Sequence, residues 1–347
     1  MIRDAASTLV RELESGRSGL IQAFLAAAWL YWVAMLRRTQ TIYVEVDSFF
    51  SPRGKVLYQF DQFLAELAQA QMPCVWMSGL TRAQLDEPRR RLGQNDPYIG
   101  ENGCGVYLPE DYFHLKGSNT IRLGRYTCIP VADAQPAAAE ALEELASDLD
   151  ISVVPLRKLS QRELSQNTGL PAREAELIRL RDFDELFFFA GAGEAAIERF
   201  RAEAKGRGLV LRNSGQFWSL ACGANLVQCV RELGGLYDRA LRSHAPRVGL
   251  CVLPSDRAPG DQQHNWPDPV FDRTLTLTAR LEPLEEAQEA TLDELPRSAT
   301  SGEISHRNQG KDFQRMSGPT SKNRFHLHSP EVWDEVLACL GAGSPPR

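Results

Sequence analysis

Two acidic side chains stand two residues apart where a short apolar run ends. The run covers residues 41–46 (TIYVEV), and the acids are Glu45 and Asp47. Runs of this length and β-branched content are typical of buried strands, and a spacing of two places both carboxylates on the same side of the strand's exit. Neighbouring carboxylates at such a position are of the type that does general acid–base chemistry. The alternative interpretation is an acidic strand end that faces solvent.

A serine hydroxyl follows the second apolar run. Residues 74–77 (CVWM) form that run, and Ser78 and Gly79 come directly after it. A hydroxyl at the end of a strand can hydrogen-bond an anion, although Ser-Gly after a strand is most often turn chemistry. The six histidines suggest no catalytic triad, and the sequence has no Gly-rich phosphate-binding loop.

The composition is that of a folded protein without a nucleic-acid surface. The 347 residues suffice for two ordinary domains, and 43% of them are apolar. The net charge is −6 and basic residues are dispersed along the chain, so we expect no nucleic-acid partner. Seven cysteines form no CxxC pair, which is typical of buried thiols in a reducing compartment. The expected location is therefore the cytoplasm.

An apolar run near the N-terminus offers an alternative location. Residues 19–36 contain one glutamine and no charge, and this 18-residue length just reaches what a membrane-spanning helix needs. A membrane anchor through residues 19–36 is therefore one interpretation. We favour two others, a helix packed on the protein or a misplaced translation start, because Met35 lies shortly before the first predicted strand.

Strand and helix patterns alternate along the chain, which indicates an α/β fold. Their order predicts two core segments separated by an inserted cap. A late segment rich in Glu, then in Ser, Gly, Asn and Lys, has a composition typical of disordered chain. The predicted boundaries are 1–38 for an N-terminal extension, 39–104 and 223–280 for the two core segments, 105–222 for the α/β cap, 281–323 for the polar insert and 324–347 for a C-terminal helix that returns to the core.

Local signals predict several elements within these segments. Helices are expected over residues 56–70 and 81–92, with Pro88 kinking or stopping the second, and over residues 225–233. Residues 209–212 and 216–220 are expected to form a hairpin, because Asn-Ser-Gly lies between them.

Four ordered pieces of the chain resemble one protein family. They are residues 81–83 (TRA), residues 89–93 (RRRLG), residues 101–103 (ENG) and residues 159–187 (LSQRELSQNTGLPAREAELIRLRDFDELF). In this order they are similar to the mannosyl-3-phosphoglycerate phosphatases of the haloacid dehalogenase superfamily. The resemblance implies a Rossmann-like core with an inserted α/β (Cof-type) cap. It also implies Mg²⁺-dependent hydrolysis of a sugar phosphate in the cleft between core and cap.

The first two family motifs are partly retained. The resemblance places Glu45 at the position of the nucleophilic aspartate and Asp47 at that of the general acid and base. Glu45 has the right functional group on a stem one methylene longer, and a misplacement of about 1 Å can cost roughly 100-fold in rate. Ser78 and Gly79 match the segment that binds phosphate, whereas Leu80 stands where the family has a basic residue.

The other two motifs depart further from the family. Leu226 stands at the position of a lysine that neutralises phosphoryl charge, a role that a hydrophobe cannot take. In the Mg²⁺ motif, a gapless alignment places Val252 at one metal position and retains Asp256. A shifted register would make Asp256 and Asp261 the acidic pair instead. If Mg²⁺ is bound, the ligands that the resemblance implies are Glu45, Asp47 and Asp256.

The resemblance extends to the cap. Arg181 and Glu185 match positions expected to meet the sugar phosphate, and the alternative is a surface ion pair. Gln216 stands in place of a basic residue of the family.

These departures lead to three hypotheses. The first is a pseudo-phosphatase, a scaffold that binds a sugar phosphate or an unknown protein partner without hydrolysis. The second is an active Mg²⁺-dependent phosphatase that hydrolyses mannosyl-3-phosphoglycerate or a related sugar phosphate. The third is a membrane-tethered interaction protein. The N-terminal run and the polar insert are candidate partner surfaces.

Overall fold

The computed structural model describes residues 40–51, 55–113, 119–214, 216–254, 270–279, 324–329 and 331–342. The predicted N-terminal extension, its apolar run at 19–36 and the predicted polar insert at 281–323 lie outside these residues. Within the described ranges, no helix has both the length and the apolar character that a membrane span requires.

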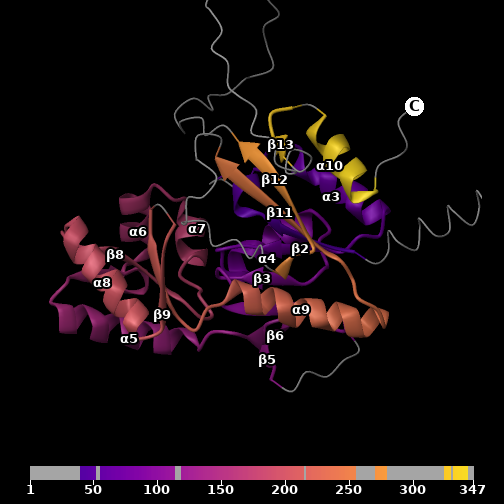
Figure 1. Cartoon of the computed structure of the whole chain (residues 1–347). Helices are drawn as coiled ribbons and strands as arrows, with labels where there is room; N and C mark the ends of the chain where they lie inside the picture. Colours follow the sequence, from indigo (N-terminus) through magenta and orange to yellow (C-terminus); the bar gives the residue numbers. More distant parts are fainter. Residues whose placement is uncertain are drawn as a thin grey trace, which may run out of the picture.

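Among the described residues, the large sheet contains nine strands, six of which are parallel, and they form the core drawn in Figure 1. In spatial order β13-β12-β11-β1-β2-β3, the parallel strands follow the doubly wound 3-2-1-4-5-6 pattern, counted along the chain. Val44 of β1 pairs with Trp76 on one side and with Leu250 on the other. Central parallel strands are covered on both faces, and four of the five β1 residues are buried. The parallel strands are β1 (Thr41–Glu45), β2 (Cys74–Met77), β3 (Tyr98–Gly100), β11 (Arg247–Pro254), β12 (Arg273–Ala279) and β13 (Arg324–His326).

Three antiparallel strands extend this sheet beyond β3. They are β4 (Gly105–Pro109), β6 (Tyr126–Pro130) and β5 (Ile121–Leu123). Strand pairing therefore assigns residues 105–130 to the large sheet, which differs from the predicted start of the cap at residue 105. The cause is the turn at residues 101–103, in which all three residues have positive φ (+48°, +56° and +90°). This turn sends β4 back alongside β3.

Helices cover both faces of the large sheet. On one face, α9 (Leu226–Leu241) packs against Tyr43 and Val75. On the other face lie α3 (Phe60–Gln69), α4 (Arg82–Arg91) and α10 (Val332–Leu340). The apolar residues of α3 recur at a helical spacing, so one side of the helix is buried; they are Phe60, Phe63, Leu64 and Leu67.

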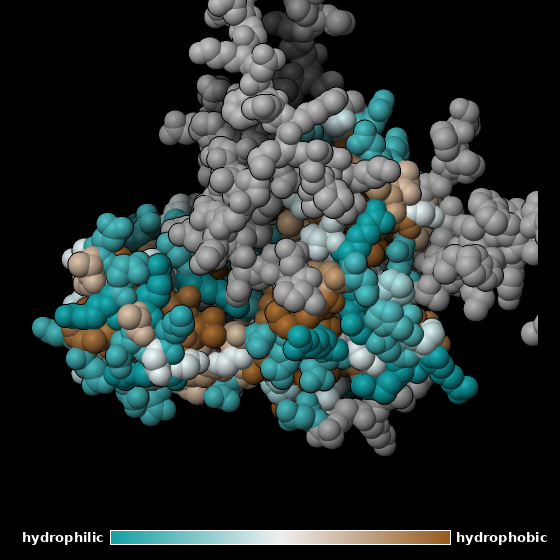
Figure 2. Space-filling model, viewed as in Figure 1, coloured by the Kyte–Doolittle hydropathy of each residue, from teal (hydrophilic) through white to brown (hydrophobic). Residues whose placement is uncertain are grey.

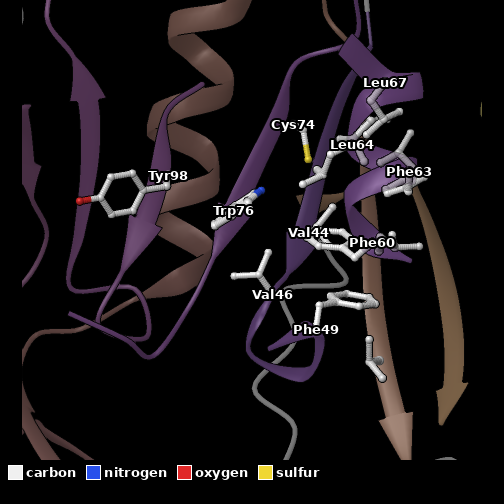
Figure 3. Packing of buried hydrophobic residues seen from close by; sticks show 14 of the residues in the cluster. Val44, Val46, Phe49, Phe60, Phe63, Leu64, Leu67, Cys74, Trp76 and Tyr98 are labelled. Carbon is white, nitrogen blue, oxygen red and sulfur yellow. The ribbon is translucent and has the colours of Figure 1, made fainter. Parts of the chain in front are cut away.

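Aromatic side chains fill the core between α3 and the sheet (Figure 3). Phe49 stacks on Phe60 with ring centroids 4.2 Å apart, and Phe63 stacks on Trp333 of α10 at 4.4 Å. Phe49 belongs to the 3-10 turn η1 (Asp47–Phe49), which directly follows β1. Packing of Phe49 therefore anchors the turn that carries Asp47.

Two helices continue past residues that predict a stop. Helix α4 runs through Pro88 to Arg91, because Thr81 and Gln84 form a capping box and Arg89 lies over the Tyr98 ring at 4.5 Å. Helix α9 extends through Gly234 to Leu241, eight residues beyond its predicted end. A Cβ at Gly234 would lie 2.0 Å from Arg247 Nε, so the close approach of Arg247 requires glycine there.

The second sheet belongs to a separate cap that lies beside the large sheet in Figure 1. Its four strands are antiparallel in the order β7-β8-β10-β9. Helices α5 and α8 cover one face and α6 and α7 the other. The predicted hairpin is confirmed as β9 and β10. The elements are α5 (Gln135–Leu149), β7 (Val153–Pro155), η2 (Leu156–Lys158), α6 (Gln161–Thr168), α7 (Ala172–Leu177), β8 (Glu185–Phe189), α8 (Glu194–Gly206), β9 (Leu209–Asn213) and β10 (Trp218–Cys222).

Candidate functional site

A cavity of about 710 Å³ lies between the core and the cap. Its core wall contains Asp47 from the turn after β1 and Gly79 from the turn after β2. Its cap wall includes residues of α7, and Arg181 from the segment before β8. In doubly wound sheets, ligands bind outside the carboxyl ends of the strands where the strand order reverses. The cavity therefore lies outside the carboxyl ends of β1 and β2, on the side of the sheet that the topology favours for a ligand.

Asp47 binds the residues that follow β2. The Ser78 hydroxyl donates a hydrogen bond to Asp47 Oδ1, and the Gly79 amide donates to Oδ2 at 2.8 Å. The Ser78 oxygen also accepts a hydrogen bond from the Leu80 amide at 3.0 Å. These donors are the groups expected to bind a phosphate. In this structure they bind the protein's own carboxylate.

The environment of Asp47 weakens its acidity. Asp47 keeps an exposed surface and lines the cavity, while protein atoms crowd its carboxyl group. The resulting desolvation raises the pKa of Asp47 to about 6, against the lowering effect of the hydrogen bonds from Ser78 and Gly79. The charge of Glu45 adds to the increase, and the Arg181 guanidinium opposes it.

The position of Glu45 relative to Asp47 differs from the one predicted by simple strand alternation. It is the last residue of β1, pairs with Met77 and is half-buried. Asp47 lies in the 3-10 turn, so the two-residue alternation of the strand does not continue to it. The two carboxylates remain close enough for the charge of Glu45 to affect the pKa of Asp47.

Arg181 connects the cavity to a buried acidic pair. Its guanidinium donates to Asp184 Oδ2 at 2.8 Å and to the Gly79 carbonyl at 2.9 Å, and lies 3.8 Å from Glu101. Glu101 is fully buried and accepts hydrogen bonds from three successive amides, those of residues 182–184, at 2.8–3.1 Å. Burial raises the pKa of Glu101 to about 8, and Arg181 opposes that shift. The cluster joins the segment that enters β8 to the turns that follow β2 and β3.

The two positions that depart most from the family are apolar in structure as well as in sequence. Leu226 begins α9 and packs with the apolar cluster on that side of the sheet, close to Gly103. Val252 is buried in β11, in the same apolar cluster as Val248 and Leu250. Neither side chain can supply a positive charge or an oxygen ligand.

Two predicted substrate residues lie away from the described lining of the cavity. Glu185 is buried in β8, accepts a hydrogen bond from Gln135 and lies 3.3 Å from Arg157. Burial raises the pKa of Glu185 to about 7. Gln216 is exposed and donates to the Thr168 carbonyl at 2.8 Å. Arg181 and Glu185 therefore have separate partners and form no surface ion pair with each other.

The residues that the structure describes fit a metal ion poorly. No cluster of three His, Cys, Asp or Glu side chains capable of holding one occurs among them. Of the predicted ligands, Glu45 and Asp47 are described, and both oxygens of Asp47 accept hydrogen bonds. Asp256 lies outside the described residues. A divalent cation prefers six or more oxygen ligands, more than the carboxylates among the described residues offer at this site.

Several cavity residues were not predicted from the sequence. They come from α4, α7 and the turn after β3, and include Gln84, Glu87, Asn102, Arg173 and Leu177. The ENG motif at residues 101–103 indicated that the turn after β3 is important, but it indicated no role for Asn102. The walls formed by α4 and α7 depend on how the cap packs on the core, and no spacing in the sequence encodes that contact.

The doubly wound parallel core with a separate cap is the arrangement that the resemblance to the haloacid dehalogenase superfamily predicts. Comparison with known proteins agrees. The chain is 26% identical over 174 residues to the glucosyl-3-phosphoglycerate/mannosyl-3-phosphoglycerate phosphatase of Methanococcoides burtonii, covering 49% of this chain and 62% of that relative. It is 26% identical over 123 residues to the mannosyl-3-phosphoglycerate phosphatase of Pyrococcus furiosus, covering 35% and 50%. No family model matches the chain.

Solved structures of similar proteins include a phosphatase of the HAD superfamily from Bacteroides thetaiotaomicron. Its TM-score is 0.45 and its identity 15%, with 69% of this chain and 90% of that chain covered. In sequence the chain resembles the mannosyl-3-phosphoglycerate phosphatases, at 26% identity over the matched segments. It spans 50–62% of the length of the two curated relatives named above.

Proposed function

We propose that this protein is a pseudo-phosphatase that binds a phosphate ester, such as a sugar phosphate, without hydrolysing it. The observation that carries the proposal is the arrangement around Asp47. Its carboxylate holds the Ser78 and Gly79 donors, and Leu226 supplies no positive charge at the position of the family's lysine.

The charge balance around Asp47 supports a loss of catalysis. A phosphoryl group placed near Asp47 and Glu45 would add negative charge to two carboxylates. Arg181 is a cation whose charge acts on Asp47, and its N–H groups already bind Asp184 and Gly79. Loss of one oriented donor in an active site typically costs about 2.7–4 kcal/mol. Because phosphate-monoester hydrolysis is among the slowest uncatalysed reactions, such losses leave little measurable rate.

One observation favours an active phosphatase as the second candidate. A pKa of about 6 for Asp47 is near the value that suits proton transfer at neutral pH. Under this candidate, Glu45 would act as nucleophile and Asp256 would contribute to binding Mg²⁺. It predicts turnover that depends on both Mg²⁺ and Glu45.

Calorimetric titration with mannosyl-3-phosphoglycerate and other sugar phosphates, with Mg²⁺ present, tests the proposal. We expect saturable binding and the intact ester at the end of each titration. Ester that is converted to inorganic phosphate during the titration would contradict the proposal and favour the second candidate. If no ester binds to folded protein, the proposed ligand is wrong, and a regulatory role through a protein partner becomes the next proposal to test.

A further inference from the structure

Arg181 is a buried cation of the cap that binds the backbone of a core turn. On the face drawn in Figure 2 the described surface is largely hydrophilic, because charged side chains mostly lie in water. The Arg181 side chain, in contrast, is only 6% exposed. Burying a charge costs free energy unless its hydrogen-bonding groups find partners. Arg181 finds them in the Asp184 carboxylate and in the Gly79 carbonyl, so its guanidinium joins cap to core.

The turn after β2 is held by the core at two carbonyls and by the cap at the carbonyl between them. Two backbone amides of the turn after β3 donate to the carbonyls of Ser78 and Leu80, at 2.9 Å and 3.3 Å. The intervening Gly79 carbonyl accepts a hydrogen bond from Arg181 Nη2 at 2.9 Å. The Gly79 carbonyl and the Leu80 amide belong to one planar peptide, so Arg181 fixes the direction of both.

The direction of that peptide determines where the Ser78 hydroxyl points. The Leu80 amide donates to Ser78 Oγ at 3.0 Å. Because this bond uses a lone pair of the oxygen, the hydroxyl proton is directed elsewhere, and Asp47 Oδ1 accepts it. A reversed peptide would present its carbonyl to Ser78 in place of the amide. The hydroxyl would then donate to that carbonyl and would be lost as a donor to an anion.

Gly79 gives the backbone the freedom for such a reversal. A Cβ at this position would lie 2.9 Å from the side-chain amide of Asn102, so the close approach of Asn102 requires glycine. Glycine also has the widest choice of backbone conformations. A contact that fixes the peptide after Gly79 reduces this freedom. Arg181 supplies that contact, and Asp184 in turn holds Arg181 in place.

We propose that Arg181 is a positioning residue: from the cap, it fixes the Gly79–Leu80 peptide and thereby directs the Ser78 hydroxyl toward the anion position, without acting as an anion ligand itself. The inference deepens the proposed function and rests on it, because that function assigns the hydroxyl to phosphate binding. It differs from the role that the family resemblance implies, in which Arg181 meets the sugar phosphate. It also makes anion binding by the core dependent on the position of the cap.

Arg181→Lys tests this role, because it keeps the positive charge but replaces the fork that binds both Asp184 and Gly79 with a single nitrogen. The hydrogen bond from Ser78 lowers the pKa of Asp47, so a misdirected hydroxyl should raise that pKa. Carbon-13 NMR of Asp47 in the full-length protein measures the pKa without a ligand. We expect Arg181→Lys to raise it by at least about half a unit. An unchanged pKa would overturn the inference.

A double-mutant cycle with Ser78→Ala shows whether Arg181 acts through the hydroxyl. Calorimetric titration with sulfate at pH 8 measures anion affinity in the four proteins of the cycle. We expect Arg181→Lys to weaken sulfate binding about five-fold when Ser78 is present and less than about two-fold in Ser78→Ala, because effects that pass through one group do not add. Losses that add would show that Arg181 contacts the anion directly, and would overturn the inference.

Arg82→Lys is the matched control. Arg82 of the core pairs with Asp182 at 3.0 Å and so also joins core to cap, next to Arg181 in the same cap segment. We expect it to change neither the pKa of Asp47 nor the affinity for sulfate. Equal changes in the two lysine variants would assign the effect to a general loosening of the cap and would overturn the inference.

Two further measurements separate the possible failures. Circular dichroism and thermal melting establish that each variant is folded before it is compared. If sulfate does not bind the wild-type protein, the anion site assumed by the proposed function is wrong. The pKa of Asp47 is measured without ligand, so it still decides whether Arg181 directs the Ser78 hydroxyl.

Discussion

The Gly79 amide donates a 2.8 Å hydrogen bond to Asp47 Oδ2, and the adjacent Ser78 hydroxyl donates to the other oxygen. A carboxylate of the chain thus holds the two donors that the proposed function assigns to an incoming oxyanion. An anion that binds at this end of the cavity must displace Asp47 or share its donors with it. The strength of anion binding therefore depends on the charge of Asp47.

Neutralising Asp47 is expected to strengthen anion binding. In Asp47→Asn the amide keeps the size of the side chain but removes the negative charge, so sulfate, used as a simple oxyanion, should bind about ten-fold more tightly at pH 7.5. Titration calorimetry measures the change. Glu87→Gln is the control, because Glu87 lines the same cavity but pairs with Arg90. An equal gain in both variants would mean that Asp47 has no special relation to the donors.

Removing the Glu101 carboxylate is expected to destabilise the protein strongly. Glu101→Ala leaves three backbone amides without an acceptor, two of them buried, and removes one of the two carboxylates near the Arg181 guanidinium. The expected loss in free energy of unfolding is about 3–5 kcal/mol, measured by urea denaturation. Glu110→Ala is the control, since Glu110 forms an exposed ion pair with Arg122 and should cost less than about 1 kcal/mol. Similar losses in the two variants would show that the Glu101 cluster is not a structural anchor.

The stability contributed by Glu185 should depend on pH. Burial raises the folded-state pKa of Glu185 to about 7 from an ordinary value near 4.5. Its carboxyl is therefore accommodated better when protonated, and its contribution to stability falls as the pH rises from about 4.5 to about 7. Glu185→Gln should gain about 1–2 kcal/mol relative to the wild type between pH 4.5 and pH 8.

The control for that experiment is Glu143→Gln. Glu143 also pairs with Arg157 but is exposed, and its pKa is lowered by the nearby Lys158. This variant should show the opposite trend or none, because an exposed carboxylate with a lowered pKa stabilises the protein at higher pH. Thermal melts across the pH range compare both variants with the wild type. A Glu185→Gln curve parallel to the wild type would contradict the assigned shift.

Gly103 is expected to tolerate no side chain. Its φ is +90°, and a Cβ there would lie 2.7 Å from the Leu226 Cα. Gly103→Ala should therefore lower the free energy of unfolding by about 2–3 kcal/mol, through backbone strain and displacement of α9. Gly193→Ala is the control, since a Cβ at Gly193 meets nothing within 4 Å. Equal urea midpoints for the two variants would show that the approach of α9 to the turn is not close in solution.

Short-range patterns in the sequence predicted the central strands and the cap hairpin correctly. The apolar runs before Glu45 and Ser78 are strands, and the Asn-Ser-Gly segment lies between the strands of a hairpin. The extension of the large sheet by β4 to β6 was missed, because it depends on three successive positive-φ residues at 101–103. The full length of α9 was missed because Gly234 predicts a break, whereas Arg247 packs against it.

The candidate site likewise contains some residues whose position the sequence predicted and others whose position it did not. Asp47, Ser78 and Gly79 come together because each follows a parallel strand, and strand order alone places such residues at one edge. Glu185 and Gln216 were expected at the substrate, but their orientation depends on the cap sheet, which directs them to partners within the cap. Leu177 reaches the cavity through the contact between α7 and α4. A single sequence without structural context does not reveal that contact.

Phosphate release by the purified full-length protein tests the central claim most directly. The assay uses mannosyl-3-phosphoglycerate with Mg²⁺ at protein concentrations close to those of the substrate, so that even a single slow turnover is detected, with Glu45→Ala measured in parallel. We expect the wild type and Glu45→Ala to release no more phosphate than buffer. Release by the wild type that is lost in Glu45→Ala would contradict the pseudo-phosphatase account and identify Glu45 as a working nucleophile.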